Sequence, residues 1–118
     1  TRVRLFGIDA PETGQMCRRG AGRWPCGQYA TVALDRLAGG KQATCRVEAT
    51  DSYDRAVAVC SVAGHDLGAE LVRAGWAVAY RHYSDRYVAE EKDARQARRG
   101  IWQGTFEEPW DWRERHKR

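Results

Sequence analysis

Short apolar runs, separated by glycine-rich or charged breaks, divide this chain into candidate strands and helices. The first run, RVRLFGI at residues 2–8, has the composition of a strand, and Pro11 ends it because proline cannot continue a strand ladder. From Gln28 the period changes, since apolar residues recur at helical spacing as far as Leu37. The glycines in AGG at 38–40 end this pattern. We therefore predict a strand followed by a helix of about ten residues.

The second half of the chain predicts a hairpin and two further helices. KQATCRVEAT at 41–50 and AVAVCSVA at 56–63 are β-type runs joined by the polar segment DSYDR. Asp66 has the position of an N-cap for a short helix in DLGAELVRAGWA. Residues 84–99 have an amphipathic pattern, for which Ser84 is the predicted N-cap.

Two stretches lack such periodicity. The Gly/Arg-rich segment 14–27 predicts an irregular surface loop, and the aromatic segment 101–118, which holds three of the five tryptophans, predicts an irregular tail packed on the domain. The order strand, helix, strand, strand, helix, helix is typical of an α+β protein, and a length of 118 residues predicts one domain over residues 1–118. Three strands are few for a sheet that carries three helices, so we expect further structure upstream of Thr1.

The composition excludes some classes of protein. With 42% hydrophobic and 31% charged residues, and no apolar run of about 20 residues, the chain predicts a globular protein with no membrane span. The net charge is +4, and only three of the 20 basic residues are lysines, namely Lys41, Lys92 and Lys117. Arginine suits phosphate groups, so a polyanionic partner is allowed; an arginine-rich codon usage explains the excess equally well.

Four cysteines predict two disulfides and hence a secreted or periplasmic protein, because they form no C-x-x-C pair with metal-ligand spacing. Of the three pairings we favour Cys17–Cys26, which closes a loop, and Cys45–Cys60, which links neighbouring strands. Free thiols in a cytosolic protein are the alternative.

The end of the first predicted strand holds the parts for metal-assisted phosphodiester hydrolysis. Arg4 can neutralise a phosphate, Asp9 can bind a hard cation such as Ca²⁺, and Glu12 can activate water. An ordinary turn with solvated acids is the alternative for DAPET.

A second group of candidates follows the hairpin. Arg55 comes directly after its tip and provides a second guanidinium for the transition state, while Tyr53 can hydrogen-bond a phosphate oxygen. Tyr80, in WAVAYRHY, can stack on a base. The alternatives are a surface ion pair of Asp54 with Arg55, and a core aromatic.

Four segments, VRLFGIDAPET, TDSYDRAVAVC, LVRAGWAVAY and GIW, resemble the staphylococcal nuclease (thermonuclease) family in order and spacing, from Val3 to Trp102. The resemblance implies an OB-type five-stranded barrel with helices packed on it, and a Ca²⁺-dependent endo/exonuclease acting on DNA and RNA. It implies the following site residues: Arg4, Glu12 and Arg55 as catalytic groups, Asp9 and the backbone carbonyl of Ala10 as calcium ligands, and Ser52, Tyr53 and Tyr80 as substrate contacts.

The chain departs from the family pattern at its start. The family's first two strands, which carry another metal-binding aspartate, are absent, so we expect Ca²⁺ to bind weakly or not at all. We expect either upstream residues in the parent protein or a homodimer formed through the exposed strand edge.

The four cysteines and the FEEPWDWR tail resemble secreted proteobacterial relatives, some of which are associated with exopolysaccharide (succinoglycan) production. Two alternatives to a nuclease therefore stay open: a non-catalytic nucleic-acid or protein-binding module, and an accessory protein of polysaccharide synthesis.

Overall fold

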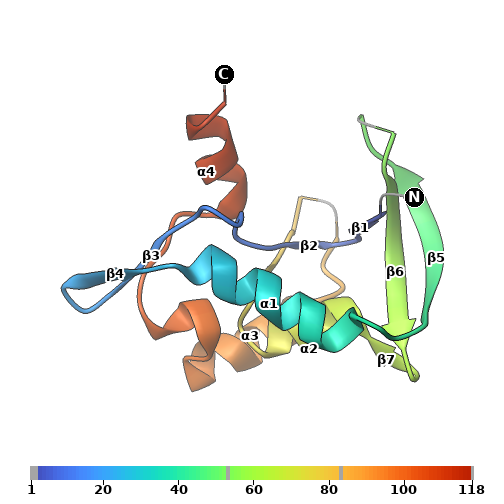
Figure 1. The fold of residues 1–118 in the computed structure, drawn as a ribbon, viewed down its shortest axis with the longest axis horizontal. Coiled ribbons are helices and arrows are strands. Elements are labelled where there is room, and N and C mark those ends of the chain that lie inside the picture. Colours follow the sequence, from blue (N-terminus) through green and yellow to red (C-terminus); the bar gives the residue numbers. More distant parts are fainter. Residues whose placement is uncertain (1–2, 53, 83, 118) are drawn as a thin grey trace.

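The main sheet pairs the first described strand with a hairpin near the middle of the sequence. The computed structural model describes residues 3–52, 54–82 and 84–117. Strand β1 (Val3–Leu5) pairs in parallel with β6 (Ala56–Val62), and β6 pairs antiparallel with both β5 (Ala43–Thr50) and the short β7 (His65–Asp66). The predicted hairpin is therefore present, as the β5–β6 pair seen edge-on in Figure 1.

Two smaller sheets lie beside it. β2 (Ile8–Asp9) pairs antiparallel with β8 (Val78–Ala79), and β3 (Cys17–Arg19) pairs with β4 (Gly22–Trp24). The expectation of an irregular loop over 14–27 is thus wrong. Gly20 has φ +61°, which permits the tight turn between β3 and β4.

Four α-helices and one 3₁₀-helix complete the described fold. They are α1 (Cys26–Ala38), α2 (Leu67–Arg73), α3 (Val88–Ala97), the 3₁₀-helix η1 (Gly100–Gln103) and α4 (Pro109–Arg115). Asp66 caps α2 as predicted, since its side chain accepts a hydrogen bond from the Ala69 N–H at 3.1 Å. The predicted start at Ser84 is wrong, because the Ser84 hydroxyl instead accepts the Arg86 N–H in a turn before α3.

The described tail over 101–117 is not irregular throughout, since η1 and α4 lie in it. Trp102, Phe106 and Trp110 pack on a buried cluster, of which Cys17, Cys26 and Ile101 are members. No helix in the described ranges is long and apolar enough to cross a membrane.

Both predicted disulfides are present, Cys17–Cys26 and Cys45–Cys60, and no cysteine is free. The first joins β3 to the start of α1. The second cross-links directly opposed residues of β5 and β6. The first disulfide therefore fixes the start of α1, the helix that contributes Thr31 and Leu34 to the cavity described below.

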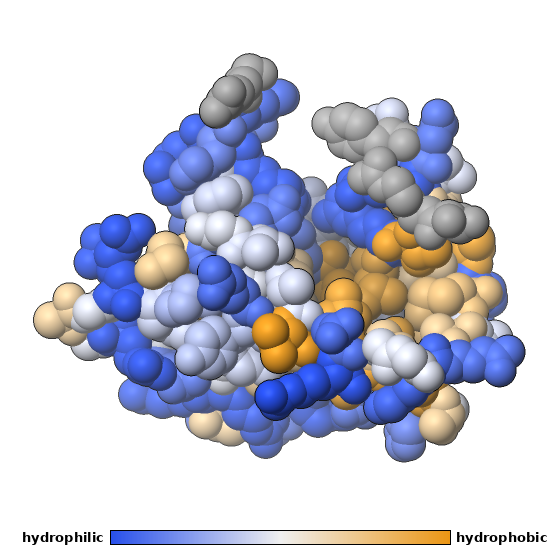
Figure 2. All heavy atoms as spheres, viewed as in Figure 1, coloured by the Kyte–Doolittle hydropathy of each residue, from blue (hydrophilic) through white to orange (hydrophobic). Residues whose placement is uncertain are grey.

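Strand β5 lies at the edge of the main sheet, and all its residues are exposed. Val47 is the most exposed of the large apolar side chains, at 59%. Figure 2 shows apolar side chains over this side of the molecule, whereas α4 and the β3–β4 hairpin are mainly hydrophilic. Association of two chains through this edge stays a prediction.

Tyr87, at the start of α3, is hydrogen-bonded to the N-cap residue of α2. This contact predicts that the free energy of unfolding depends on pH. Tyr87 is buried, and its hydroxyl donates to Asp66 at 2.8 Å. Burial and this hydrogen bond raise the pKa of Tyr87 to about 12, from the usual 10. Because the raised pKa favours the protonated folded state, the stabilisation is complete below pH 10 and is lost as the pH rises to about 12.

We expect the free energy of unfolding, measured by urea titration, to fall across this interval. Tyr87→Phe should be less stable at neutral pH and should lose most of this fall. Tyr29→Phe, at an exposed position, is the control. An equal fall in Tyr87→Phe would show that other groups cause it.

Candidate active site

A cavity of about 310 Å³ brings the predicted catalytic side chains together. It is lined by residues of five segments of the chain, among them Arg4, Asp9, Ala10, Glu12, Arg55 and Arg113. Helix α1 contributes Thr31 and Leu34. Figure 2 shows a hollow on this face, between α4 and the β5–β6 hairpin.

Strand pairing explains why two arginines meet in this cavity. Arg4 lies opposite Val57, and Val3 lies opposite Ala56, so Arg55 precedes β6 at the same end of the sheet at which β1 carries Arg4. Residues more than 50 positions apart in sequence are thereby brought to one wall of the cavity.

The Arg55 side chain is oriented by a carboxylate of its own turn. Its Nε donates to Asp51 Oδ2 at 2.7 Å, and its backbone N–H donates to Asp51 Oδ1 at 2.9 Å. The Asp51 side chain is only 6% exposed. Arg55 therefore forms an ion pair with the buried carboxylate of Asp51, whereas the alternative from the sequence was a surface pair with Asp54.

Asp9 lies between two guanidinium groups. Arg113 of α4 donates to both of its oxygens, Nη1 to Oδ1 at 2.8 Å and Nη2 to Oδ2 at 2.7 Å, and Arg4 Nη2 lies 3.6 Å from Oδ1. The Asp9 side chain is 5% exposed, so these partners offset the cost of burying its charge. The hydrogen bonds to Asp9 raise the pKa of Arg113 above its usual value.

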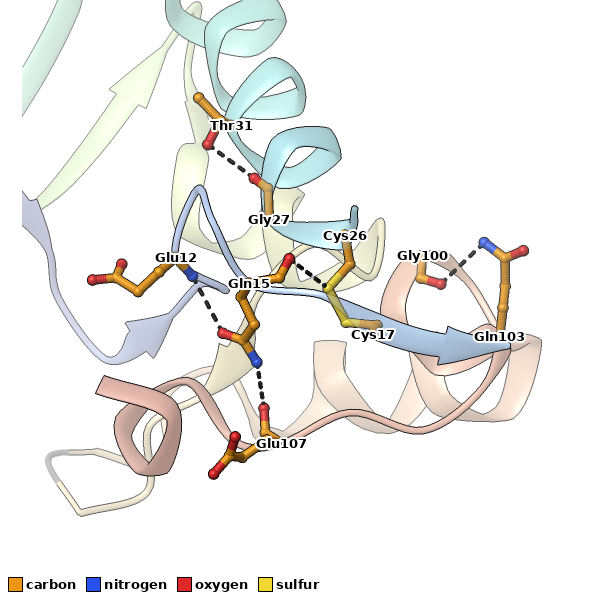
Figure 3. The surroundings of a disulfide bond; sticks show 9 residues. All are labelled: Glu12, Gln15, Cys17, Cys26, Gly27, Thr31, Gly100, Gln103 and Glu107. Carbon is orange, nitrogen blue, oxygen red and sulfur yellow. Dashed lines mark hydrogen bonds between the residues drawn. A yellow bond between two sulfur atoms is a disulfide. The ribbon is translucent and has the colours of Figure 1, made fainter. Parts of the chain in front are cut away.

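Glu12 lies on a turn that is held from two sides (Figure 3). Gln15, which is fully buried, accepts the Glu12 N–H through Oε1 at 3.3 Å and donates through Nε2 to the Glu107 carbonyl at 2.7 Å. A Cβ at Gly27 would overlap the carbonyl of Glu12, so the start of α1 can approach the turn only with glycine there. The Glu12 carboxylate points away from Gln15 and the disulfide.

A group of aromatic side chains lies beside Arg4. The Arg4 guanidinium carbon lies 6.0 Å from the centre of the Tyr80 ring, at the limit of a cation–π contact. The Tyr80 ring is 5.0 Å from that of Trp110, and His82 lies edge-on to both. Tyr80 is thus next to Arg4, and its role as a substrate contact stays a prediction.

The remaining predicted substrate contacts are not brought to the cavity by any described feature. Ser52 is exposed in the hairpin turn. Tyr53 lies outside the described residues. Their roles as substrate contacts stay predictions.

Calcium does not fit the oxygen atoms of this site as they are arranged. Ca²⁺ takes six to eight oxygen ligands. Both oxygens of Asp9 accept hydrogen bonds from Arg113, and the described part of the chain contains no group of three or more His, Cys, Asp or Glu side chains that could hold a metal ion. A cation at Asp9 would first have to displace a guanidinium.

We did not foresee the contributions of Gln15, Trp110 and Arg113 from the sequence. The sequence predicts only that the tail packs on the domain. Its aromatic residues signalled packing, but nothing in the tail indicated that one arginine returns to Asp9.

The chain matches known proteins over most of its length. A family model described as staphylococcal nuclease homologue matches residues 2–104. The chain is 33% identical over 115 residues to a probable staphylococcal-like nuclease, CAN2, of Oryza sativa subsp. japonica, which covers 95% of this chain and 29% of the relative. It is 35% identical over 118 residues to an uncharacterized endonuclease of Escherichia coli O157:H7, which covers 97% of this chain and 71% of the relative.

The chain spans less than a third of the length of the rice relatives. A probable endonuclease, LCL3, of Schizophyllum commune is 32% identical over 121 residues, with 85% of this chain and 39% of the relative covered. With the family model matching residues 2–104, the chain belongs to the staphylococcal nuclease homologue family and has the α+β fold of that family.

Proposed function

We propose that this chain is a nuclease domain that hydrolyses phosphodiester bonds of DNA and RNA. The observation that carries the proposal is the convergence of Arg4, Arg55 and Glu12 on one cavity. Two guanidinium groups and a carboxylate are the groups needed to hold a phosphate and to activate water beside it. Relatives named as nucleases and endonucleases support the same reaction class.

In the proposed mechanism, Arg4 and Arg55 bind the oxygens of the scissile phosphate. Their charges matter most in the pentavalent transition state, where negative charge builds up on these oxygens. Glu12 takes a proton from water, which attacks phosphorus in line with the leaving group. The bond to the 5′-oxygen breaks, that oxygen takes up a proton from solvent, and a 3′-phosphate remains.

Calcium dependence is the part of the proposal that rests on the family resemblance alone. A Ca²⁺ ion would add charge beside the phosphate and would use Asp9 and the Ala10 carbonyl. Since Arg113 engages Asp9 in the described arrangement, we derive no step from a bound metal.

The test is cleavage of labelled single-stranded DNA and RNA, in Ca²⁺ and in EGTA, by the 118-residue chain and by any longer natural form that contains it. The proposal predicts cleavage with 3′-phosphate ends. Cleavage in EGTA would contradict the calcium requirement only, and absence of cleavage by every form would contradict the catalytic function.

A non-catalytic module that binds nucleic acid is the second candidate. The pairing of Asp9 with Arg113 favours it, because a site without an open metal ligand can hold phosphate without cleaving it. Binding without cleavage in the same assay would support this candidate.

We also propose a secreted or periplasmic location, since two disulfides are typical of oxidising compartments.

A further inference from the structure

Arg113 reaches the candidate active site from the far end of the chain. It lies 104 positions from Asp9, on α4, beyond residues 2–104 that match the family model. Figure 1 shows α4 standing beside the segment that joins β2 to β3. Arg113 therefore lies outside the part of the chain that the family model covers, and its contact with Asp9 needs its own explanation.

Arg113 faces the same cavity as the two proposed catalytic arginines. Its side chain is 34% exposed, while those of Arg4 and Arg55 are 24% and 27% exposed. All three are thus held in place yet accessible to a ligand in the cavity. The carboxylates that orient them, Asp9 and Asp51, are almost fully buried.

The charges of this group do not cancel within its ion pairs. Asp51 pairs with Arg55, but Asp9 serves both Arg4 and Arg113, so a single negative charge faces two positive ones. Glu12, on the cavity wall, brings the carboxylates to three for three arginines, so the excess of positive charge is local to Asp9. Asp9 accepts two hydrogen bonds from Arg113, and a guanidinium has further N–H donors in the same plane for a phosphate oxygen.

We propose that Arg113 provides the cation of this site: together with Arg4 and Arg55 it binds a phosphate group of single-stranded nucleic acid without a divalent metal. This inference rests on the nucleic-acid substrate of the proposed function. The inference concerns binding of the nucleic acid and not its cleavage. The experiment can therefore contradict the inference without contradicting the proposed hydrolysis, and the reverse.

The experiment measures binding of a short fluorescein-labelled single-stranded DNA by fluorescence anisotropy in EDTA, over a series of salt concentrations. The wild-type chain is expected to bind. Arg113→Gln should bind at least about tenfold more weakly, and the slope of log K against log salt concentration should become shallower by about 0.7 for one lost phosphate contact.

Arg115→Gln is the matched control. It removes the same charge from the same helix, but Arg115 pairs with Glu107 and does not line this cavity. Its affinity and salt slope should stay close to those of the wild type. Thermal unfolding of each variant checks that it is folded at the assay temperature, because Arg113→Gln leaves Asp9 with a single cationic partner.

Arg113→Lys keeps the positive charge but removes the planar set of N–H donors of the guanidinium. This variant is used if Arg113→Gln is unfolded. It should also bind more weakly than the wild type, since an ammonium cannot hold Asp9 and a phosphate in one plane. A purely structural role would lower the melting temperature without changing the salt slope.

Three results would overturn the proposal. The wild type could require Ca²⁺ for binding, the Arg113 variant could retain wild-type affinity and slope, or it could bind DNA more tightly in Ca²⁺, which would mean that Arg113 blocks a metal site. Binding in EDTA without cleavage under any condition would contradict the hydrolysis and leave this inference intact.

Discussion

Glu12→Gln is expected to lower kcat by about 100-fold to 10,000-fold, the range typical of a general base. The amide has nearly the same shape as the carboxylate but cannot accept a proton from the attacking water. The turn should keep its structure, since the Glu12 main chain is held by Gln15 and the start of α1. Single-turnover cleavage of labelled DNA measures the chemical step directly.

The matched control is Glu114→Gln, because the Glu114 side chain is exposed on α4 and, among the described residues, forms one long ion pair, with Lys117. This variant should cleave at the wild-type rate. Glu12→Gln should bind DNA at least as tightly as the wild type, since it removes a negative charge from the cavity wall. An unchanged kcat in Glu12→Gln would exclude this residue as the base.

Arg55→Lys is expected to lower kcat by about 100-fold, the usual loss when one donor to a transition state is removed. Lysine keeps the positive charge, so Asp51 is not left without a cation, but it cannot donate to Asp51 and to a phosphate in one plane. The loss should therefore appear mainly in kcat, with a smaller change in the affinity for DNA.

Arg46→Lys provides the comparison, since Arg46 lies on the neighbouring strand β5 and is paired with the exposed Glu48. We expect no change in rate for this variant. If Arg55→Lys and the wild type had equal kcat values and differed only in urea stability, Arg55 would hold the hairpin turn and take no part in the reaction.

Local patterns predicted the elements whose stability is mostly local. The β5–β6 hairpin, the N-cap of α2 and the end of α1 before two glycines all follow from residues within a few positions of one another. The two disulfides were also predicted, as the favoured of three possible pairings, because one closes a loop and the other links neighbouring strands.

Elements that depend on distant partners were missed or misplaced. The β3–β4 pair is tied to the tail by hydrogen bonds between Arg18 and Thr105, which no local pattern of 14–27 reveals. Helix α3 begins at Val88 because Tyr87 is anchored by Asp66 of the preceding helix cap. Tertiary contacts therefore decided boundaries that sequence periodicity left open.

The candidate site shows the same division. Arg4, Asp9 and Glu12 lie close together in the sequence, so their proximity was predicted, although the single strand predicted there is divided into β1 and β2. Arg55 joins them through the family resemblance. No sequence pattern indicated Gln15 or Arg113. Gln15 matters through its hydrogen bond to Glu107, and Arg113 through its hydrogen bonds to Asp9, and both partners are distant in the sequence.

The contact of Asp9 with Arg113 also orders events during synthesis. Asp9 leaves the ribosome 104 residues before Arg113, so the cavity acquires its third arginine only after α4 has been synthesised. Until then the growing polypeptide, which lies close to messenger and ribosomal RNA, has an incomplete site for phosphate.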